Sequence, residues 1–185
     1  MSGHEPMRAV FLDRDDTLIR NVPYLGDPAG VEILPGVAEG LGLLNDAGFR
    51  LLVVSNQSGV GRGLITKEQV AAVNLAMESK VGPGLIGGYY LSYADPSDPS
   101  AANERKPSPA LLFRARDELG LDLGRCFMVG DKRIDIECAR NAGCRAVLVR
   151  TGTVAFEVEG AEDLADHAAD DFLAAAQWIL SQTKT

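Results

Sequence analysis

The sequence predicts an α/β fold: a single Rossmann-like domain of three layers, with a parallel central sheet between helices and no large cap domain. Short apolar runs bounded by glycine and polar residues alternate with stretches of helical periodicity, which is typical of a parallel sheet covered on both faces. No linker, repeat or low-complexity tract divides the 185 residues, of which 46% are hydrophobic. Residues 1–185 are therefore expected to form one domain with a substantial core.

Each expected element follows from its residue types. A polar loop with proline and glycine separates the first apolar strand from the first helix, which Gly48 ends. Thr66 and Gln69 have the spacing of a capping box, so a helix begins there. Near the end of the chain, Trp178 lies on an apolar helical face and is expected in the core. In chain order we expect strand 9–12, helix 36–47, strand 50–54, a helix from residue 66, strand 87–91, helix 108–119, strand 126–129, helix 134–141, strand 145–149 and helix 169–180.

Two carboxylates, Asp13 and Asp15, follow the first strand at a spacing of two residues. Because the chain turns where a strand ends, both side chains can face one pocket beyond the carboxyl end of the sheet. One carboxylate can then attack phosphorus while the other transfers protons. An isolated pair of this kind is about as often a solvated turn, so its interpretation depends on the other strand ends.

Two further segments offer groups that can hold a phosphate. After the second strand, Ser55 provides a hydroxyl, and the turn over residues 56–59 provides backbone N–H groups. Lys106, which Pro107 biases toward an extended conformation, can meet both the phosphate and the nucleophile as a point charge. Each segment alone is commonly an ordinary loop or a surface basic pair. Together with the carboxylate pair they favour phosphoryl transfer.

In the fourth segment an apolar strand ends with Gly-Asp. Asp131 lies at this strand end, and Asp135 follows four residues later. Magnesium prefers oxygen ligands in near-octahedral geometry, so Asp131 is suited to complete a Mg²⁺ site with Asp13.

In this order, the four segments resemble the motifs of the haloacid dehalogenase superfamily of phosphatases. The nearest likeness is to the D-glycero-D-manno-heptose 1,7-bisphosphate phosphatase group, with the histidinol-phosphate phosphatases as near relatives. The likeness covers most of the chain, from about Arg8 to the last helix. It rests on residues 11–15, 34–37, 56–63, 105–107 and 130–132.

The resemblance implies a phosphatase that acts through an aspartyl-phosphate intermediate, with Mg²⁺ as cofactor. It makes Asp13 the nucleophile and Asp15 the general acid and base, and Ser55 and Lys106 would hold the phosphate. The substrate is a small phosphorylated metabolite, first heptose 1,7-bisphosphate, which would lose its 7-phosphate, with histidinol phosphate or another sugar phosphate as the alternative. The expected metal ligands are Asp13, Asp15 and Asp131, with Asp135 as a further candidate, and the expected substrate contacts are Arg14, Asn56, Gln57, Arg62 and Arg105. A solvated helix end is the alternative for Arg62.

The chain departs from the heptose enzymes at two places. Asp16 stands where they usually have glycine. Where they commonly carry a zinc-holding Cys-x-His and Cys-x-Cys, this chain has Leu91, Tyr93, Ala102 and Glu104, so no structural zinc is expected. The loop over residues 92–104 must then be ordered by proline turns and local hydrogen bonds, or be mobile.

Composition and charge argue against several kinds of binding partner. The net charge of −8 argues against a role in nucleic-acid binding. Residues 1–7 lack the pattern of a targeting signal, and no apolar run approaches the length of a membrane span, so we expect a cytoplasmic monomer without a membrane partner. The three cysteines, Cys126, Cys138 and Cys144, are expected as small buried side chains rather than ligands or disulfide partners.

Two alternatives belong to other functional classes. Response-regulator receiver domains also phosphorylate an aspartate on a parallel sheet, but they place the phosphorylated aspartate in the middle of the chain and the lysine last. Here the expected nucleophile follows the first strand, and Lys106 precedes Asp131. A binding module without catalysis is the other alternative, and the complete set of motifs argues against it.

Overall fold

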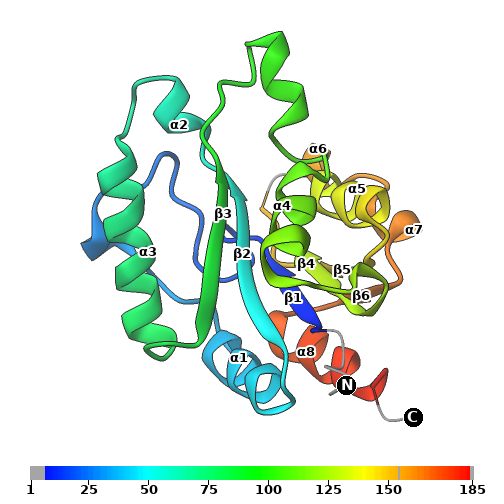
Figure 1. Ribbon diagram of the computed structural model, residues 1–185. Coiled ribbons are helices and arrows are strands. Elements are labelled where there is room, and N and C mark those ends of the chain that lie inside the picture. The colour runs from blue at the N-terminus through cyan, green and yellow to red at the C-terminus, as the bar shows by residue number, and fades with distance from the viewer. Residues whose placement is uncertain (1–6, 154, 184–185) are drawn as a thin grey trace.

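The computed structural model describes residues 7–153 and 155–183. Within these ranges, a six-stranded parallel sheet has the strand order β3-β2-β1-β4-β5-β6 (Figure 1). The strands are β1 (Ala9–Leu12), β2 (Arg50–Asn56), β3 (Ile86–Ser92), β4 (Phe127–Gly130), β5 (Arg145–Val149) and β6 (His167–Ala169). The order reverses beside β1, so the loops that follow β1, β2 and β4 meet at the carboxyl edge of the sheet.

Helices cover both faces of this sheet (Figure 1), as expected for a fold of three layers. The helices are α1 (Val37–Asp46), α2 (Ser58–Gly61), α3 (Lys67–Val81), α4 (Ala110–Leu119), α5 (Arg133–Ala142), α6 (Ala155–Val158), α7 (Ala161–Leu164) and α8 (Phe172–Ser181), with 3-10 turns η1 (Pro28–Gly30), η2 (Pro99–Asn103) and η3 (Leu123–Arg125). The segment from β1 to α1 contains η1, and the segment from β2 to α3 contains α2. Neither segment forms a cap domain.

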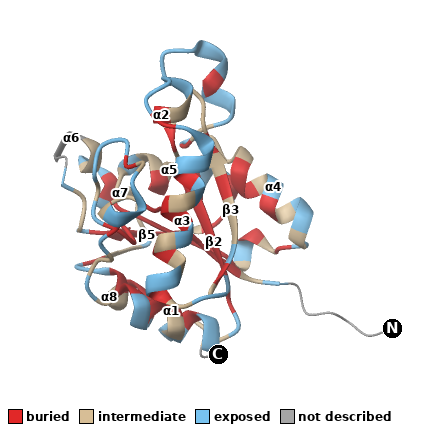
Figure 2. Ribbon diagram, turned by 90° about the vertical axis from the view of Figure 1, so that its left-hand side faces the viewer, coloured by how far each residue is buried: buried red, intermediate tan, exposed pale blue. Residues whose placement is uncertain are grey.

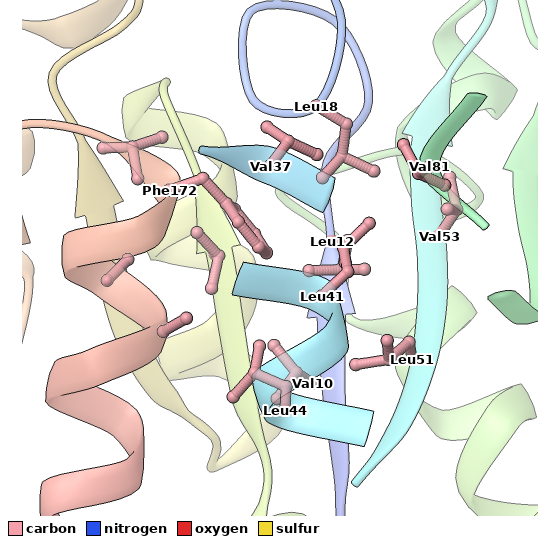
Figure 3. Packing of buried hydrophobic residues seen from close by; sticks show 14 of the residues in the cluster. Val10, Leu12, Leu18, Val37, Leu41, Leu44, Leu51, Val53, Val81 and Phe172 are labelled. Carbon is pink, nitrogen blue, oxygen red and sulfur yellow. The ribbon is translucent and has the colours of Figure 1, made fainter. Parts of the chain in front are cut away.

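The core consists of two apolar layers separated by the sheet. Residues 10 and 12 of β1 pack with α1, α3 and α8, whereas residues 9 and 11 pack on the opposite face with α4, α5 and α7. Figure 3 shows the first layer, in which Leu12, Leu41 and Phe172 lie close together. Figure 2 shows the buried strands between helices whose outer surfaces are exposed. Because β1 is apolar on both faces and paired on both edges, its end holds the next residue, Asp13, firmly in place.

Most of the expected elements are confirmed. Strands 9–12 and 145–149 have the expected bounds, and Thr66 and Gln69 form the expected capping box at the start of α3. The strand expected over 50–54 continues to Asn56, and the helix expected from residue 108 begins at Ala110. The final helix was expected from residue 169 and begins at Phe172, because residues 167–169 form a sixth strand that the sequence analysis missed.

The three cysteines are buried and form no disulfide among the described residues, as expected. Burial raises the pKa of Cys126 to about 11 and that of Cys138 to about 12, so both remain thiols. Among the described residues, no helix has the length and apolar character needed to cross a bilayer. Residues 1–6, which belong to the stretch expected to lack a targeting signal, lie outside the described ranges.

Helices α1 and α8 approach each other closely at Gly40. A Cβ atom at this position would lie 2.8 Å from Cδ1 of the buried Phe172 ring and 3.3 Å from Cβ of Ala176. At Gly42, in the same helix, a Cβ atom would meet nothing within 4 Å. The two glycines therefore lie in the same helix, but only Gly40 packs closely against α8.

We expect Gly40→Ala to lower the free energy of unfolding by about 1–3 kcal/mol, because the new methyl group overpacks the interface between α1 and α8. Gly42→Ala is the matched control and should raise the free energy of unfolding by about 0.5–1 kcal/mol, since alanine is the better helix former. Urea denaturation followed by circular dichroism measures both values. Equal effects of the two substitutions would contradict the packing assigned to Gly40.

Candidate active site

The candidate site lies where β1, β2 and β4 end. Asp13 follows β1 and donates its backbone N–H to the carbonyl of Val129 at 2.9 Å, which extends the ladder between β1 and β4 by one residue. Ser55 is buried near the end of β2, and Asp131 is buried directly after β4. The parallel sheet thus brings together the residues that the sequence predicted from separate strand ends.

Lys106 is the cation at the centre of this group, and only 3% of the residue is exposed. Its Nζ lies 2.6 Å from Oδ1 of Asp13 and 2.6 Å from Oδ1 of Asp135, and it donates to the carbonyl of Val54 at 2.9 Å. Burial by itself would lower the pKa of Lys106, but the two carboxylates outweigh it and hold the pKa above its usual value. Lys106 is therefore a fixed, charged ammonium.

Three buried carboxylates, Asp13, Asp131 and Asp135, face one another around this ammonium. One oxygen from each lies within 4.8 Å of the others. Burial, followed by the negative charges of Asp13 and Asp135, raises the pKa of Asp131 to about 9. Burial also raises the pKa of Asp135 to about 6, although Lys106 opposes the shift. Lys132 and Lys106 oppose the shift at Asp131 but do not cancel it, so the repulsion among the three buried carboxylates is only partly offset.

The donor set in this cluster suits a divalent cation. Oδ1 of Asp131 accepts a hydrogen bond from Thr17 at 3.2 Å, but its buried Oδ2 has no hydrogen-bond partner. A buried oxygen without a partner, beside two further carboxylates, matches the oxygen ligands that Mg²⁺ prefers. The sequence analysis expected Asp13, Asp15 and Asp131 as metal ligands, with Asp135 as a further candidate; in the structure the carboxylate of Asp135 lies with those of Asp13 and Asp131.

The carboxylate of Asp15 lies outside this cluster because other groups bind it. Both of its oxygens accept from Nη2 of Arg14 at 3.1 Å, and Oδ2 also accepts from Nε2 of Gln57 at 2.9 Å. The side chain is 20% exposed, so the carboxylate is held in one orientation but is open to the cavity above it. Arg14 and Gln57 thus orient this carboxylate toward the cavity.

A chain of side-chain hydrogen bonds continues behind Asp15. Arg14 is only 1% exposed and donates to Oδ1 of Asn74 at 3.0 Å and to Oε1 of Gln57 at 2.9 Å. Gln57 in turn donates to Oγ of Ser55 at 2.8 Å. The sequence analysis missed Asn74, although it lies on the face of α3 that Val70, Val73 and Met77 bury, and a polar residue within such an apolar face was the available signal.

Asn56 holds the backbone of Lys106 in place. Its Oδ1 accepts from the amide of Lys106 at 3.0 Å, and its Nδ2 donates to the carbonyl of Lys106 at 3.1 Å. Arg14, Asn56 and Gln57 were all expected to contact the substrate. In the structure their side chains make hydrogen bonds that position Asp15, Ser55 and Lys106.

A polar cavity of about 260 Å³ opens above Asp15, and residues 21–25, residues 56–59 and Lys132 also line it. Three larger cavities lie elsewhere, with volumes of about 460, 390 and 300 Å³. They lie beside the end of β5, between α3 and β3, and around Phe127 and Gln182, and Asp15 lines none of them. Because Asp15 lines it, the smaller cavity is the candidate binding site.

Two arginines from the sequence analysis lie beside each other near this site. Arg62 is exposed, donates to the hydroxyl of Tyr24 at 2.8 Å and pairs with Asp95 at 3.6 Å. Burial, followed by the neighbouring Arg62 guanidinium, lowers the pKa of Arg105, whose buried Nε has no hydrogen-bond partner. The pair concentrates positive charge in a protein that is acidic as a whole.

The loop over residues 92–104 is held by local hydrogen bonds and close packing, the first of the two expected arrangements. Asp95 accepts from the amide of Ser97 at 2.9 Å, and Asp98 caps η2 by accepting from the amide of Ser100 at 2.9 Å. A Cβ atom at Gly61 would lie 2.7 Å from the backbone nitrogen of Asp95, so α2 packs directly against this loop.

Comparisons with known proteins agree with this geometry. The family model described as HAD-hydrolase-like matches residues 103–175. The D-glycero-D-manno-heptose-1,7-bisphosphate 7-phosphatase of Thermosynechococcus vestitus is 37% identical over 94% of this chain and 96% of its own length. The D-glycero-beta-D-manno-heptose-1,7-bisphosphate 7-phosphatase of Escherichia coli K12 is 37% identical over 84% of this chain and 86% of its own.

A solved structure is similar over nearly the whole chain. The D,D-heptose 1,7-bisphosphate phosphatase from B. bronchiseptica, complexed with magnesium and phosphate, has a TM-score of 0.86 at 25% identity, covering 96% of this chain and 100% of that one. The protein is thus a phosphoric monoester hydrolase, which rules out the receiver and binding-module alternatives. Its motifs, fold and relatives together show that the chain belongs to the haloacid dehalogenase-like phosphatases, in the family of the heptose-1,7-bisphosphate 7-phosphatases.

Proposed function

We propose that this phosphatase removes the 7-phosphate of D-glycero-D-manno-heptose 1,7-bisphosphate through an aspartyl-phosphate on Asp13. The observation that carries the proposal is the buried pair of Asp13 and Lys106 at 2.6 Å, with Asp15 fixed two residues later at the floor of a polar cavity. Relatives that bear the name of this activity match the chain over most of its length, which supports the substrate.

Asp13 is the nucleophile. Lys106 binds Oδ1 and holds the carboxylate at the end of β1, so that the other oxygen can form the bond to phosphorus. A carboxylate that meets a phosphate dianion at about 4 Å faces a repulsion on the order of 8 kcal/mol at an effective dielectric of 20. The ammonium of Lys106, within hydrogen-bond distance of the same carboxylate, offsets part of that repulsion.

Asp15 is the general acid and base. In the first step its protonated carboxyl gives a proton to the leaving sugar oxygen as the bond from phosphorus to that oxygen breaks. In the second step the carboxylate takes a proton from the water that attacks the aspartyl-phosphate and releases inorganic phosphate. Arg14 and Gln57 keep the carboxyl pointing toward the cavity during both steps.

Asp13, Asp131 and Asp135 are the residues that would hold Mg²⁺, on the evidence of their shared cluster and the unpartnered oxygen of Asp131. When bound there, the ion would supply positive charge that offsets the repulsion between the carboxylate of Asp13 and the phosphate. The carboxylate of Asp15 lies outside this cluster, where Arg14 and Gln57 bind its oxygens.

Ser55 and the paired arginines complete the proposed site. The hydroxyl of Ser55, which accepts from Gln57, is free to donate its own hydrogen to a phosphate oxygen. Arg62 and Arg105 supply positive charge for the part of the substrate that extends beyond the reacting phosphate.

Asp13→Asn should reduce phosphate release by at least ~10²-fold, because the amide keeps the shape of the side chain but cannot attack phosphorus. The exposed capping residue Asp27 offers the control Asp27→Asn, which should leave the rate unchanged. Steady-state phosphate release measures both variants, and circular dichroism checks that both are folded. An Asp13→Asn enzyme with more than a few per cent of the wild-type rate would exclude this nucleophile.

Chelation followed by addition of Mg²⁺ alone should restore full activity. The loop between Leu91 and Glu104 contains no cysteine or histidine to hold a structural zinc, and hydrogen bonds from Asp95 and Asp98 hold it instead. The melting temperature of the chelated protein should therefore stay close to that of the untreated protein in the presence of Mg²⁺. Tightly bound zinc, at one atom per chain in elemental analysis, would contradict this prediction.

A panel of phosphate esters tests the substrate directly. We expect the highest kcat/KM for heptose 1,7-bisphosphate. For histidinol phosphate and for sugar monophosphates, which lack the second phosphate for the arginine pair, kcat/KM should be lower by about tenfold or more. Comparable values across the panel would reject the heptose assignment while leaving the phosphatase chemistry in place.

A further inference from the structure

Asp16 occupies a backbone conformation that usually requires glycine. Its φ is +60°, in the left-handed region, and the residue is 2% exposed. Aspartate tolerates this region better than most residues but less well than glycine, which the heptose enzymes usually have here. A buried carboxylate also costs free energy unless hydrogen bonds satisfy it. Asp16 therefore carries two energetic costs, a left-handed backbone and a buried carboxylate.

The side chain of Asp16 joins two loops. Its Oδ1 accepts from the amide of Asn21 at 3.1 Å, within the loop that follows β1. Its Oδ2 accepts from the hydroxyl of Thr153 at 2.8 Å, across 137 residues of sequence. The backbone carbonyl of Asp16 also accepts from the hydroxyl of Thr151. Residues 151–153, which follow β5, are thus attached to Asp16 at both ends.

Between these two threonines, Gly152 lies directly against Asp131. A Cβ atom at Gly152 would be 2.9 Å from Oδ2 of Asp131 and 3.0 Å from its backbone oxygen. On the other side, Thr17, the neighbour of Asp16, donates to Oδ1 of Asp131 at 3.2 Å. Asp131 therefore lies between Thr17 and Gly152, and Asp16 connects both of them.

We propose that Asp16 is a positioning residue whose carboxylate holds residues 151–153 against Asp131 and so fixes the Asp131 carboxylate in the cluster with Asp13 and Asp135. Asp16 itself touches neither the substrate nor the reacting atoms. Because the proposal assigns Asp131 to a Mg²⁺ site, this part of it rests on the proposed function. Its structural part, the attachment of residues 151–153 to Asp16, is independent of that function.

Asp16→Gly and Thr153→Val test the attachment from both sides. Glycine adopts the left-handed backbone freely and keeps the carbonyl that Thr151 binds, so the substitution removes only the two side-chain hydrogen bonds. Valine keeps the shape of threonine without its hydroxyl. Amide hydrogen exchange over residues 150–153 in the metal-free protein should be about tenfold faster in each variant, since a lost hydrogen bond to a charged group favours local opening. Exchange over residues 150–153 in the double variant should be no faster than in Asp16→Gly alone, because both substitutions break the same bond between Asp16 and Thr153.

Mg²⁺ titration by calorimetry, without substrate, tests the consequence for Asp131. The dissociation constant should increase by about three- to tenfold in Asp16→Gly, and Asp16→Asn should recover part of the affinity, because its amide oxygen can still accept one of the two bonds. Asp122→Gly is the matched control: Asp122 caps η3 at the other edge of the sheet by accepting from Gly124, and its loss should change neither exchange over 150–153 nor Mg²⁺ affinity.

Each result decides one part of the proposal. Exchange at the wild-type rate in Asp16→Gly would overturn the attachment, and faster exchange with unchanged Mg²⁺ affinity would overturn the positioning of Asp131. A wild-type protein that binds no Mg²⁺ would overturn the metal assignment in the proposed function, and with it the role given to Asp131, while the exchange rates would still decide the attachment.

Discussion

The ammonium of the buried Lys106 lies between two carboxylates and a backbone carbonyl. A buried charge is costly unless it is paired and hydrogen-bonded, so this arrangement requires every partner to be present. The partners come from the end of β1, the end of β2 and the first turn of α5, while Asn56 holds the backbone of Lys106. Because one buried ammonium needs all of these partners, the ends of β1 and β2, the first turn of α5 and the segment that carries Lys106 meet at the candidate active site.

A second polar network supports the first without sharing its charges. It runs from Asn74 through Arg14 and Gln57 to Asp15 and Ser55, so the guanidinium of Arg14 neutralises Asp15 and keeps it apart from the carboxylates around Lys106. The separation gives two neighbouring aspartates different environments, which is how one site assigns different tasks to similar groups. The apolar layers on both faces of the sheet make this precision feasible, because the strand ends that carry these residues cannot shift without disturbing the core.

The sequence predicted the residues at strand ends because a strand buried on both faces is a continuous apolar run, and the polar residues that interrupt it are easy to locate. It predicted Asp13, Ser55 and Asp131 in one place for this reason, and it predicted Lys106 from the proline that follows it. It missed β6, because a strand of three residues with two alanines has little periodicity to detect. It also placed Asp15 with Asp13 and Asp131 and gave Asp135 only as a further candidate, whereas the carboxylate of Asp135 lies in the cluster. Which oxygen faces which neighbour depends on partners such as Arg14 and Lys106 that only the folded chain brings together. The bond from Asp16 to Thr153 spans 137 residues and has no local signature at all.

The position of β1 at the centre of the sheet has a consequence for a chain that leaves the ribosome from its N-terminal end. β1 can pair with β2 soon after both are made, but its other edge waits for β4, since Val10 lies opposite Phe127. Throughout that interval a strand that is apolar on both faces has one edge unpaired, a state prone to wrong association with other chains. Assembly of the site around Asp13 therefore waits for the synthesis of β4, and a nascent chain stalled before β4 would carry the nucleophile without the fold that makes it reactive.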